Sequence, residues 1–306
     1  MDKYAILAYH GVTKTLSEGI ENFSGKHIQA DEFEKHISYI CENMNPVSLR
    51  KMACSLGSGI SLPKESISIT FDDCYKNVHD VALPILRKYD VPATFFISTG
   101  FVETNRLFWT DLLECIINKT EVESFNIVLG NSNRSFDLLS KNKKINAIIE
   151  IKTNLKKCTP TIRDTILGEL RDKLNVDVGA NNVKNYLNLS WNDIIRLNDP
   201  PNYEVGGHTV NHEILAYLEE PLLKNEINDC LCHLNDALNN LVDLFSYPEG
   251  QHEHFNNKVI SFLIKAGITI CPSTVYGFNH LHADSFYLKR IMPGFMNTPF
   301  PFSIPN

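Results

Sequence analysis

The stretch ITFDDCYKN, residues 69–77, places two carboxylates directly after an apolar run that is typical of a buried strand. Asp72 and Asp73 repel each other, and burying a charge is costly unless it is paired. A bound cation would reduce this cost. It would also allow one aspartate to bind the metal while the other stays ionised as a general base. The alternative interpretation is that the two aspartates cap the helix that follows.

Strand and helix signals alternate on both sides of this stretch. Before residue 102, apolar runs predict strands over 4–10, 66–73 and 93–100, and helical spacing predicts helices over 31–44 and 77–89. Asp31 is the expected cap of the first helix, and Pro84 is expected to kink the second. After residue 188, strands are expected over 203–209, 243–250, 268–273 and 286–293, with helices over 189–197, capped by Ser190, 221–241 and 256–267. Strand and helix at this spacing predict parallel βα units.

The segment from about 102 to 190 interrupts this alternation. Its amphipathic patterns are rich in charge and predict helices over 108–119, 141–158 and 161–174. We interpret the segment as a mainly helical insertion in one domain that spans 1–306, and we expect it to narrow access to the site. The alternative is that these are helices of the main fold, with weak strands between them.

Composition excludes several classes of partner. The 306 residues carry a formal charge of −7, which disfavours binding to nucleic acid or to an anionic membrane surface. No apolar run approaches the 18 residues of a membrane span, and the N-terminus lacks the basic flank of a signal peptide. The eight cysteines match no common zinc or redox spacing, which predicts reduced thiols and a cytoplasmic protein.

Several polar side chains follow predicted strands, where parallel α/β barrels carry their chemistry. His10 follows the first strand, the aspartate pair follows a later one, and HTVNH (208–212) follows another. His208 and His212 are four residues apart, a spacing that suits one face of a helical turn and a shared metal. Two histidines and one carboxylate leave coordination sites open for water and substrate. Each position taken alone is typical of a cap or a turn.

TFDD (70–73) and HTVNH together resemble the polysaccharide deacetylases with a NodB-homology domain. The resemblance covers 4–101 and about 190–293, and it implies a distorted (β/α)7 barrel with a mainly helical insertion. It also implies that Asp72 is the general base and that Asp73, His208 and His212 bind one divalent metal ion, for which zinc is expected.

The remaining family motifs are altered. In the family, the third motif reads Arg-x-Pro-Tyr-Gly; here SYPEG (246–250) lacks the Arg and has Glu249 in place of Tyr. The backbone N–H of Glu249 is then the expected oxyanion donor. Arg290 fits a subgroup in which a basic residue orients the base. The C-terminal Leu-x-His motif is missing, and ILAYHGV (6–12) resembles its form in circularly permuted members, which makes His10 the candidate general acid.

The resemblance implies a metal-dependent hydrolase that removes an N-acyl group, above all N-acetyl, from an amino sugar or glycan precursor. Hydrolysis of another C–N bond, such as a deformylation or the opening of a cyclic imide or ureide, is an alternative. An inactive carbohydrate-binding relative is a second alternative, kept open by the altered third motif. The expected partner is therefore a carbohydrate, with no nucleic acid and no membrane span.

Overall fold

The structure is a computed structural model that describes residues 3–301. The chain divides into two compact units. The first comprises Met1–Lys14, Ser24–Thr104 and Asn188–Asn306, and the second comprises Thr15–Phe23 and Asn105–Leu187. Each unit has its own buried side chains.

A parallel sheet forms the centre of the first unit. Its main strands are β1 (Ala5–Tyr9), β5 (Ser66–Phe71), β6 (Ala93–Ile97) and β9 (Tyr203–Gly207), in that order. The short β4 (Asn45–Pro46) also pairs with β5, while β2 (Gly11–Thr13) and β3 (His27–Gln29) form a separate parallel pair. In the main sheet Tyr9 is opposite Phe71, so the carboxyl ends of β1 and β5 meet at one edge.

Isolated parallel bridges extend the sheet beyond its named strands. Gly207 bridges to Phe245 and Leu244 bridges to Ile270, while on the other side Leu7 bridges to Ile291. The segments predicted as strands over 243–250, 268–273 and 286–293 are therefore present as parallel neighbours, although they form bridges rather than full ladders. This arrangement agrees with the distorted βα barrel expected from the sequence.

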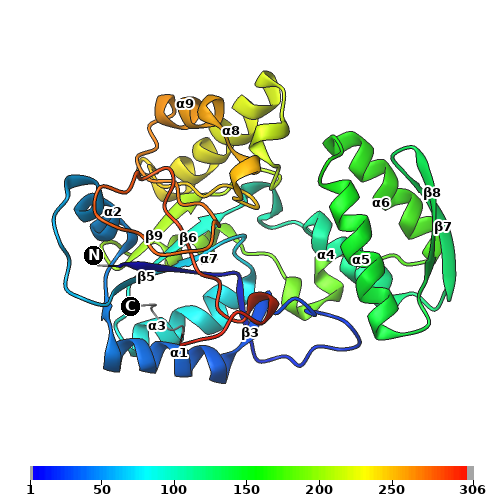
Figure 1. The fold of residues 1–306 in the computed structure, drawn as a ribbon, viewed down its shortest axis with the longest axis horizontal. Helices are drawn as coiled ribbons and strands as arrows, with labels where there is room; N and C mark the ends of the chain where they lie inside the picture. The colour runs from blue at the N-terminus through cyan, green and yellow to red at the C-terminus, as the bar shows by residue number, and fades with distance from the viewer. Residues whose placement is uncertain (1–2, 302–306) are drawn as a thin grey trace. The chain divides into compact units, whose positions relative to one another are not determined.

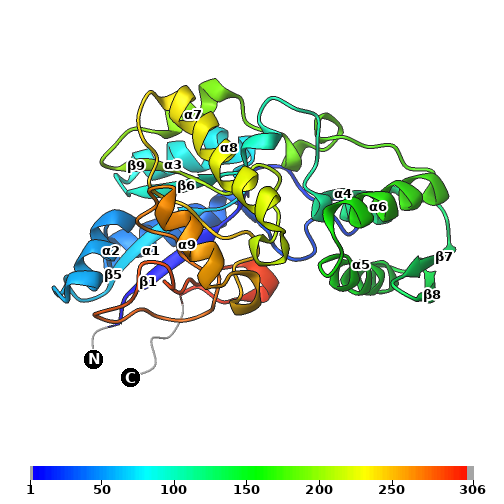
Figure 2. The same cartoon turned by 90° about the horizontal axis from the view of Figure 1, so that it is seen from above.

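Helices lie along both sides of the sheet, α1 and α3 on one side and α8 and α9 on the other (Figure 1). Figure 2 shows the same elements from above. In this unit the helices are α1 (Ala30–Asn43), α2 (Leu49–Ser58), α3 (Leu83–Lys88), α7 (Trp191–Leu197), α8 (Glu220–Leu238) and α9 (Asn257–Lys265). The helix α2 packs against β5, and α7 and α8 pack against β9.

Of the local predictions about helix ends, the cap at Asp31 is wrong and the cap at Ser190 is confirmed. Asp31 lies in the first turn of α1, whose N-cap is Gln29 with no side-chain cap bond. Pro84 is the second residue of α3, directly after the π-helical turn Val78–Ala82, and the backbone stays helical across this junction, so the expected kink at Pro84 stays a prediction. Ser190 caps α7 as predicted, and it forms a reciprocal capping box with Asp193.

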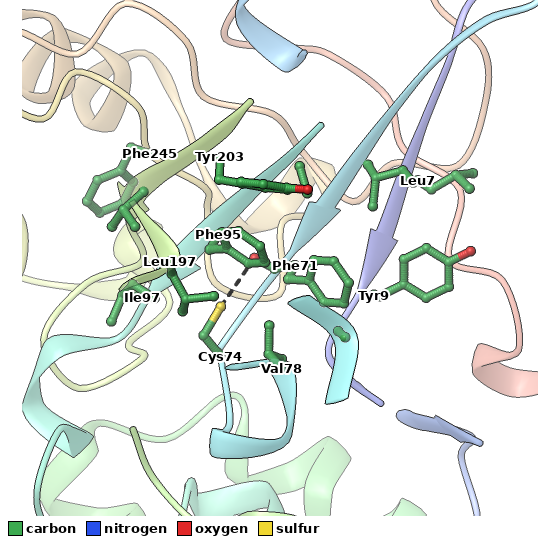
Figure 3. Close-up of a cluster of buried hydrophobic side chains, with 14 of the residues drawn as sticks. Leu7, Tyr9, Phe71, Cys74, Val78, Phe95, Ile97, Leu197, Tyr203 and Phe245 are labelled. Carbon is green, nitrogen blue, oxygen red and sulfur yellow. Dashed lines mark hydrogen bonds between the residues drawn. The ribbon is translucent and has the colours of Figure 1, made fainter. Parts of the chain in front are cut away.

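The core of the first unit lies around the strand ends that carry the polar side chains. Phe71 stacks on Phe95 with ring centroids 5.4 Å apart, and Tyr9 packs edge-on against Phe33. Figure 3 shows this cluster, in which Phe71, Phe95 and Tyr203 line up across neighbouring strands. Buried aromatic packing therefore fixes the positions of the strand ends.

The second unit is helical with one hairpin. Its helices are α4 (Trp109–Lys119), α5 (Lys141–Leu155) and α6 (Pro160–Leu174), and β7 (Ser124–Leu129) pairs with β8 (Ser132–Asp137) in antiparallel fashion. The sequence predicted the helices but not the hairpin. Trp109 is buried against the guanidinium of Arg163, so it packs in the core of this unit.

No helix between residues 3 and 301 combines the length and the apolar character that a bilayer span requires.

Two glycines allow the same substitution to be tested with opposite results. Gly168 lies inside α6, and a Cβ added there would meet nothing within 4 Å. We expect Gly168→Ala to raise the free energy of unfolding by about 0.5–1 kcal/mol, because alanine restricts the unfolded chain and favours helix.

At Gly11 a Cβ would lie 1.9 Å from His27 Nδ1. Gly11→Ala should therefore destabilise its unit by about 1–3 kcal/mol. Chemical denaturation measures both, and a shift of the same sign in both variants would contradict the expected difference between the two positions.

Candidate metal centre and catalytic carboxylate

The polar residues singled out in the sequence follow parallel strands. His10 comes directly after β1, Asp72 and Asp73 after β5, and His208 after β9. Because β1, β5, β6 and β9 are parallel and in register at their ends, these residues share one edge of the sheet. The turn after β5 aims the two aspartates differently, since Asp73 has a φ of 63° in the left-handed region.

Asp73, His208 and His212 converge on one point. Asp73 Oδ1 lies 3.4 Å from His208 Nε2 and 3.1 Å from His212 Nε2. This carboxylate oxygen is buried, yet it forms no hydrogen bond that meets geometric criteria within the described residues. A buried oxygen that faces two imidazole nitrogens without a proper hydrogen bond fits a site for a cation, and the three residues form a ligand set for a divalent metal.

The tautomer of His208 favours the same interpretation. Its Nδ1 lies 2.8 Å from the carbonyl oxygen of Ser246, and a carbonyl can only accept a hydrogen bond. Nδ1 therefore carries the proton in the neutral ring, and Nε2 offers its lone pair toward Asp73. Metal-binding histidines are typically oriented by a partner of this kind.

The loop between the two histidines forms no helical turn, so the expectation based on their four-residue spacing is wrong. Thr209 and His212 have φ values of 66° and 57°, both in the left-handed region. Instead, the loop is held by Glu226 of α8. Its carboxylate accepts hydrogen bonds from the backbone N–H groups of Val210 and Asn211, at 2.9 and 2.8 Å, and from Asn211 Nδ2 at 2.7 Å.

Asp72 is bound in a buried ion pair with Arg290. Arg290 Nη1 donates to Asp72 Oδ1 at 2.8 Å and Nη2 donates to Oδ2 at 2.6 Å, and the arginine is fully buried. The guanidinium is itself fixed by the carbonyl of Ser273, by Thr70 Oγ1 and by Ser246 Oγ. The bidentate geometry holds the carboxylate in one orientation.

Ser246 stands at the position of the missing Arg in the third motif. Its hydroxyl accepts from Arg290 Nη2 at 2.8 Å and donates to Asp72 Oδ2 at 3.4 Å. The small side chain leaves room for a guanidinium that arrives from another segment of the sheet. Arg290 thus supplies the charge that the motif lacks at position 246.

The charges of the site reinforce one another. Burial acts to raise the pKa of Asp72, but the charge and hydrogen bonds of Arg290, together with the nearby His208 and His10, lower that pKa below its usual value. Burial likewise acts against ionisation of Asp73, yet Lys26 and His212 hold its pKa well below the usual range. Both carboxylates are therefore ionised at neutral pH.

Cys74 directly follows the two aspartates in the turn after β5. Its φ is 62°, so the turn does adopt the left-handed conformation that favours glycine. The thiol is buried in the cluster of Figure 3, where Sγ donates to the carbonyl of Phe71 at 3.7 Å. Burial raises the pKa of Cys74 well above its usual value, so the thiol is protonated within this packed cluster.

His10 lies within the electrostatic field of the site. Its ring is half-buried and stacks on Phe295 at a centroid distance of 6.0 Å. Burial lowers the pKa of His10 to about 4, although Asp73 and Asp72 act in the opposite direction. The imidazole is therefore neutral at pH 7, and the expected role of His10 as a general acid stays a prediction.

Glu249 is held in a strained turn near the second histidine. Its φ is 60°, and its backbone carbonyl accepts a hydrogen bond from Thr274 Oγ1. The Glu249 carboxylate acts to raise the pKa of His212, which places its charge within reach of the metal centre. Its role in the reaction stays a prediction.

Three residues of the site were missed by sequence reasoning: Lys26, Ser246 and Glu226. Lys26 Nζ lies 3.0 Å from Asp73 Oδ2, although 47 positions separate the two residues. Lys26 and Glu226 are not part of a recognisable motif. Only the missing Arg of the third motif pointed to position 246.

A second group of potential ligands, His79, Asp80 and Asp193, has a different explanation. Asp193 accepts hydrogen bonds from the backbone N–H and the hydroxyl of Ser190, the residue that caps α7. Asp193 also pairs with Lys76 at 3.0 Å. These contacts satisfy the carboxylate without a metal.

Comparison with known proteins identifies the family of the chain. A family model described as polysaccharide deacetylase matches residues 59–271, and the chain belongs to that family. A poly-beta-1,6-N-acetyl-D-glucosamine N-deacetylase of Staphylococcus aureus is 32% identical over 119 residues, which is 35% of this chain and 40% of the relative. The match thus spans less than half the length of that curated relative.

Solved structures show the same fold. The Streptococcus pyogenes deacetylase PplD in complex with acetate has a TM-score of 0.57 at 19% identity, covering 97% of this chain and 94% of its own. IcaB from Ammonifex degensii has a TM-score of 0.59 at 16% identity, covering 96% and 92%. The fold class expected from the sequence is confirmed, while the circularly permuted arrangement stays a prediction.

Glu226 offers a test of how the metal centre is positioned. We expect Glu226→Ala to weaken binding of a divalent cation by about 10–100-fold, because the loop that carries His212 loses three hydrogen bonds. Competition with a chromophoric chelator measures the affinity. Asp193→Ala is the matched control, since it also removes a buried carboxylate that fixes a local turn. Equal losses of affinity in both variants would show that Glu226 acts only through general stability.

Proposed function

We propose that this chain is a metal-dependent deacetylase that hydrolyses the N-acetyl group of an amino sugar within a glycan. The observation that carries the proposal is that two adjacent carboxylates have different partners. Asp73 faces two imidazoles with one oxygen, and Asp72 beside it is ionised and locked by Arg290. A cation site next to a fixed base is the arrangement that amide hydrolysis requires.

Asp73, His208 and His212 would hold the metal, and zinc suits a ligand set of two imidazoles and one carboxylate. A divalent cation there would polarise the amide carbonyl and make a water molecule more acidic. The buried Asp73 Oδ1, which lacks a hydrogen bond of good geometry within the described residues, supports this assignment.

Asp72 would accept the proton of the attacking water. It is ionised at neutral pH because Arg290 lowers its pKa. The bidentate contact prevents the carboxylate from rotating toward the metal, which keeps it available as a base. Arg290 is therefore a positioning residue rather than a proton donor.

His10 would give a proton to the leaving nitrogen, and the N–H of Glu249 would face the developing oxyanion. Negative charge that develops on the substrate would raise the pKa of His10 from the low value set by burial. The strained turn at Glu249 fixes the direction of its backbone groups. The carboxylate of Glu249 must point away from the oxyanion for this role.

The name of the staphylococcal relative suggests the substrate class. That protein acts on a β-1,6-linked polymer of N-acetyl-D-glucosamine, and we propose a related N-acetylated glycan or glycan precursor for this chain. The segment expected as an insertion over 102–190 contains most of the second unit, and its effect on substrate access stays a prediction. A cytoplasmic location stays part of the proposal, and the eight cysteines are free thiols.

Separate substitutions of Asp72 and Asp73 by asparagine distinguish their two proposed roles. We expect Asp72→Asn to retain one metal ion but to lose about 10²–10⁴-fold in turnover, since the base is removed while the ligands remain. Asp73→Asn should instead lose the metal. Metal content by elemental analysis and deacetylation of an N-acetylglucosamine oligomer measure the two properties. Loss of metal in Asp72→Asn, with retention in Asp73→Asn, would reverse the assignments.

The acid role of His10 can be tested with leaving groups of different basicity. His10→Ala should lose about 10²–10⁴-fold in turnover on an N-acetyl sugar, whose amine must be protonated to leave. It should lose far less on an activated acetate ester, whose leaving group departs without a proton. Undiminished turnover of the variant on the amide would eliminate the proposal.

A further inference from the structure

The β2–β3 pair brings a lysine to the metal centre. The two strands are parallel, with Gly11 opposite His27. Lys26, which precedes β3, therefore lies next to His10, which precedes β2. Gly11 is required here, since a Cβ would collide with the ring of His27. The backbone N–H of Gly11 donates to the carbonyl of Lys26 at 3.4 Å and closes the start of the pair.

The lysine contacts a metal ligand directly. Lys26 Nζ lies 3.0 Å from Asp73 Oδ2, and the lysine side chain is only 14% exposed. The Tyr75 hydroxyl donates to the same oxygen at 3.2 Å, and the Lys26 ammonium sits over the Tyr75 ring at 5.0 Å. The ammonium is thus fixed in place by a carboxylate and an aromatic face.

These contacts divide the Asp73 carboxylate into two halves. Oδ2 is held by Lys26 and Tyr75, while Oδ1 faces His208 and His212. A cation at the three ligands would reach Oδ1 and would share its only carboxylate with an ammonium. The other two ligands are imidazoles, which bring no negative charge.

We propose that Lys26 lowers the affinity of this site for its metal ion. Its positive charge offsets the single negative charge of the ligand set, and its contact with Oδ2 leaves Asp73 as a one-oxygen ligand. The metal is then held by fewer opposite charges, exchanges more readily and polarises its other ligands more strongly. The inference concerns metal affinity and does not depend on which acyl group or sugar is the substrate.

The expected change in metal affinity follows from the repulsion between the Lys26 ammonium and the metal ion. An ammonium and a divalent cation on the same carboxylate lie within several ångströms of each other, and even with water-like screening their repulsion amounts to at least about tenfold in binding. Loss of the lysine would leave Tyr75 to orient Oδ2, so the geometry of Asp73 should survive. Removing the charge of Lys26 should therefore change the metal affinity more than any change in the orientation of Asp73 does.

The test is a comparison of zinc affinities in the full-length protein by competition with a chromophoric chelator. Lys26→Met, which keeps the length of the side chain but not its charge, should bind zinc at least about tenfold more tightly than the original protein. Lys26→Arg should stay within about threefold. A gain in affinity cannot come from a damaged fold, so this readout separates charge tuning from a structural role.

A matched control uses another paired lysine. Lys88 pairs with Glu34 at 2.5 Å on the surface of the first unit, and Lys88→Met should leave zinc affinity unchanged. If Lys26→Met does not fold, Lys26→Gln serves the same comparison. Unchanged or weaker zinc binding in the uncharged variants would overturn the proposal. If the original protein itself binds no zinc, cobalt or nickel, both this inference and the metal-dependent function fail, whereas normal metal binding without deacetylation would remove the function alone.

Discussion

The buried pair of Asp72 and Arg290 is the interaction on which the site depends. It joins the end of β5 to a segment more than 200 positions further along the chain, and the arginine also binds Thr70, Ser246 and Ser273. Removing one partner of such a pair typically costs about 3–5 kcal/mol, because the other charge is left buried and uncompensated. The same contact keeps Asp72 ionised. The same ion pair therefore stabilises this edge of the sheet and keeps the proposed base ionised.

Two adjacent aspartates are tolerated in the core because each has its own positive environment. Asp72 has the guanidinium, while Asp73 has the Lys26 ammonium on one oxygen and two imidazoles on the other. Neither partner set would suffice for both carboxylates, since a buried charge needs nearby compensation and hydrogen bonds. Ser246 links the two environments. Its carbonyl orients His208 and its hydroxyl bridges Asp72 and Arg290, so one residue contacts both the proposed metal ligand and the proposed base.

Backbone strain is concentrated in the loops that carry these groups. Left-handed φ values occur in the turns after β5 and β9 and in the third motif, at Asp73, Cys74, Thr209, His212 and Glu249. Each such non-glycine residue costs on the order of 1–3 kcal/mol and persists only where the surroundings determine it. Here the surroundings are the aromatic core beneath the strand ends and the Glu226 carboxylate that holds the histidine loop. The strain aims side chains that a relaxed turn would direct elsewhere.

The sequence by itself determined the strand–helix alternation, the strand-end positions of His10, Asp72 and His208, and the family, because apolar periodicity and short motifs are local properties. It suggested Arg290 only through resemblance, and it misplaced the two histidines on a helical turn, since spacing alone cannot reveal left-handed backbone. Tertiary structure alone decided that Lys26 contacts Asp73, that Glu226 holds the histidine loop and that Ser246 contacts Arg290. These contacts join residues that are distant along the chain, and only the register of the strands and the packing of α8 bring them within hydrogen-bonding distance.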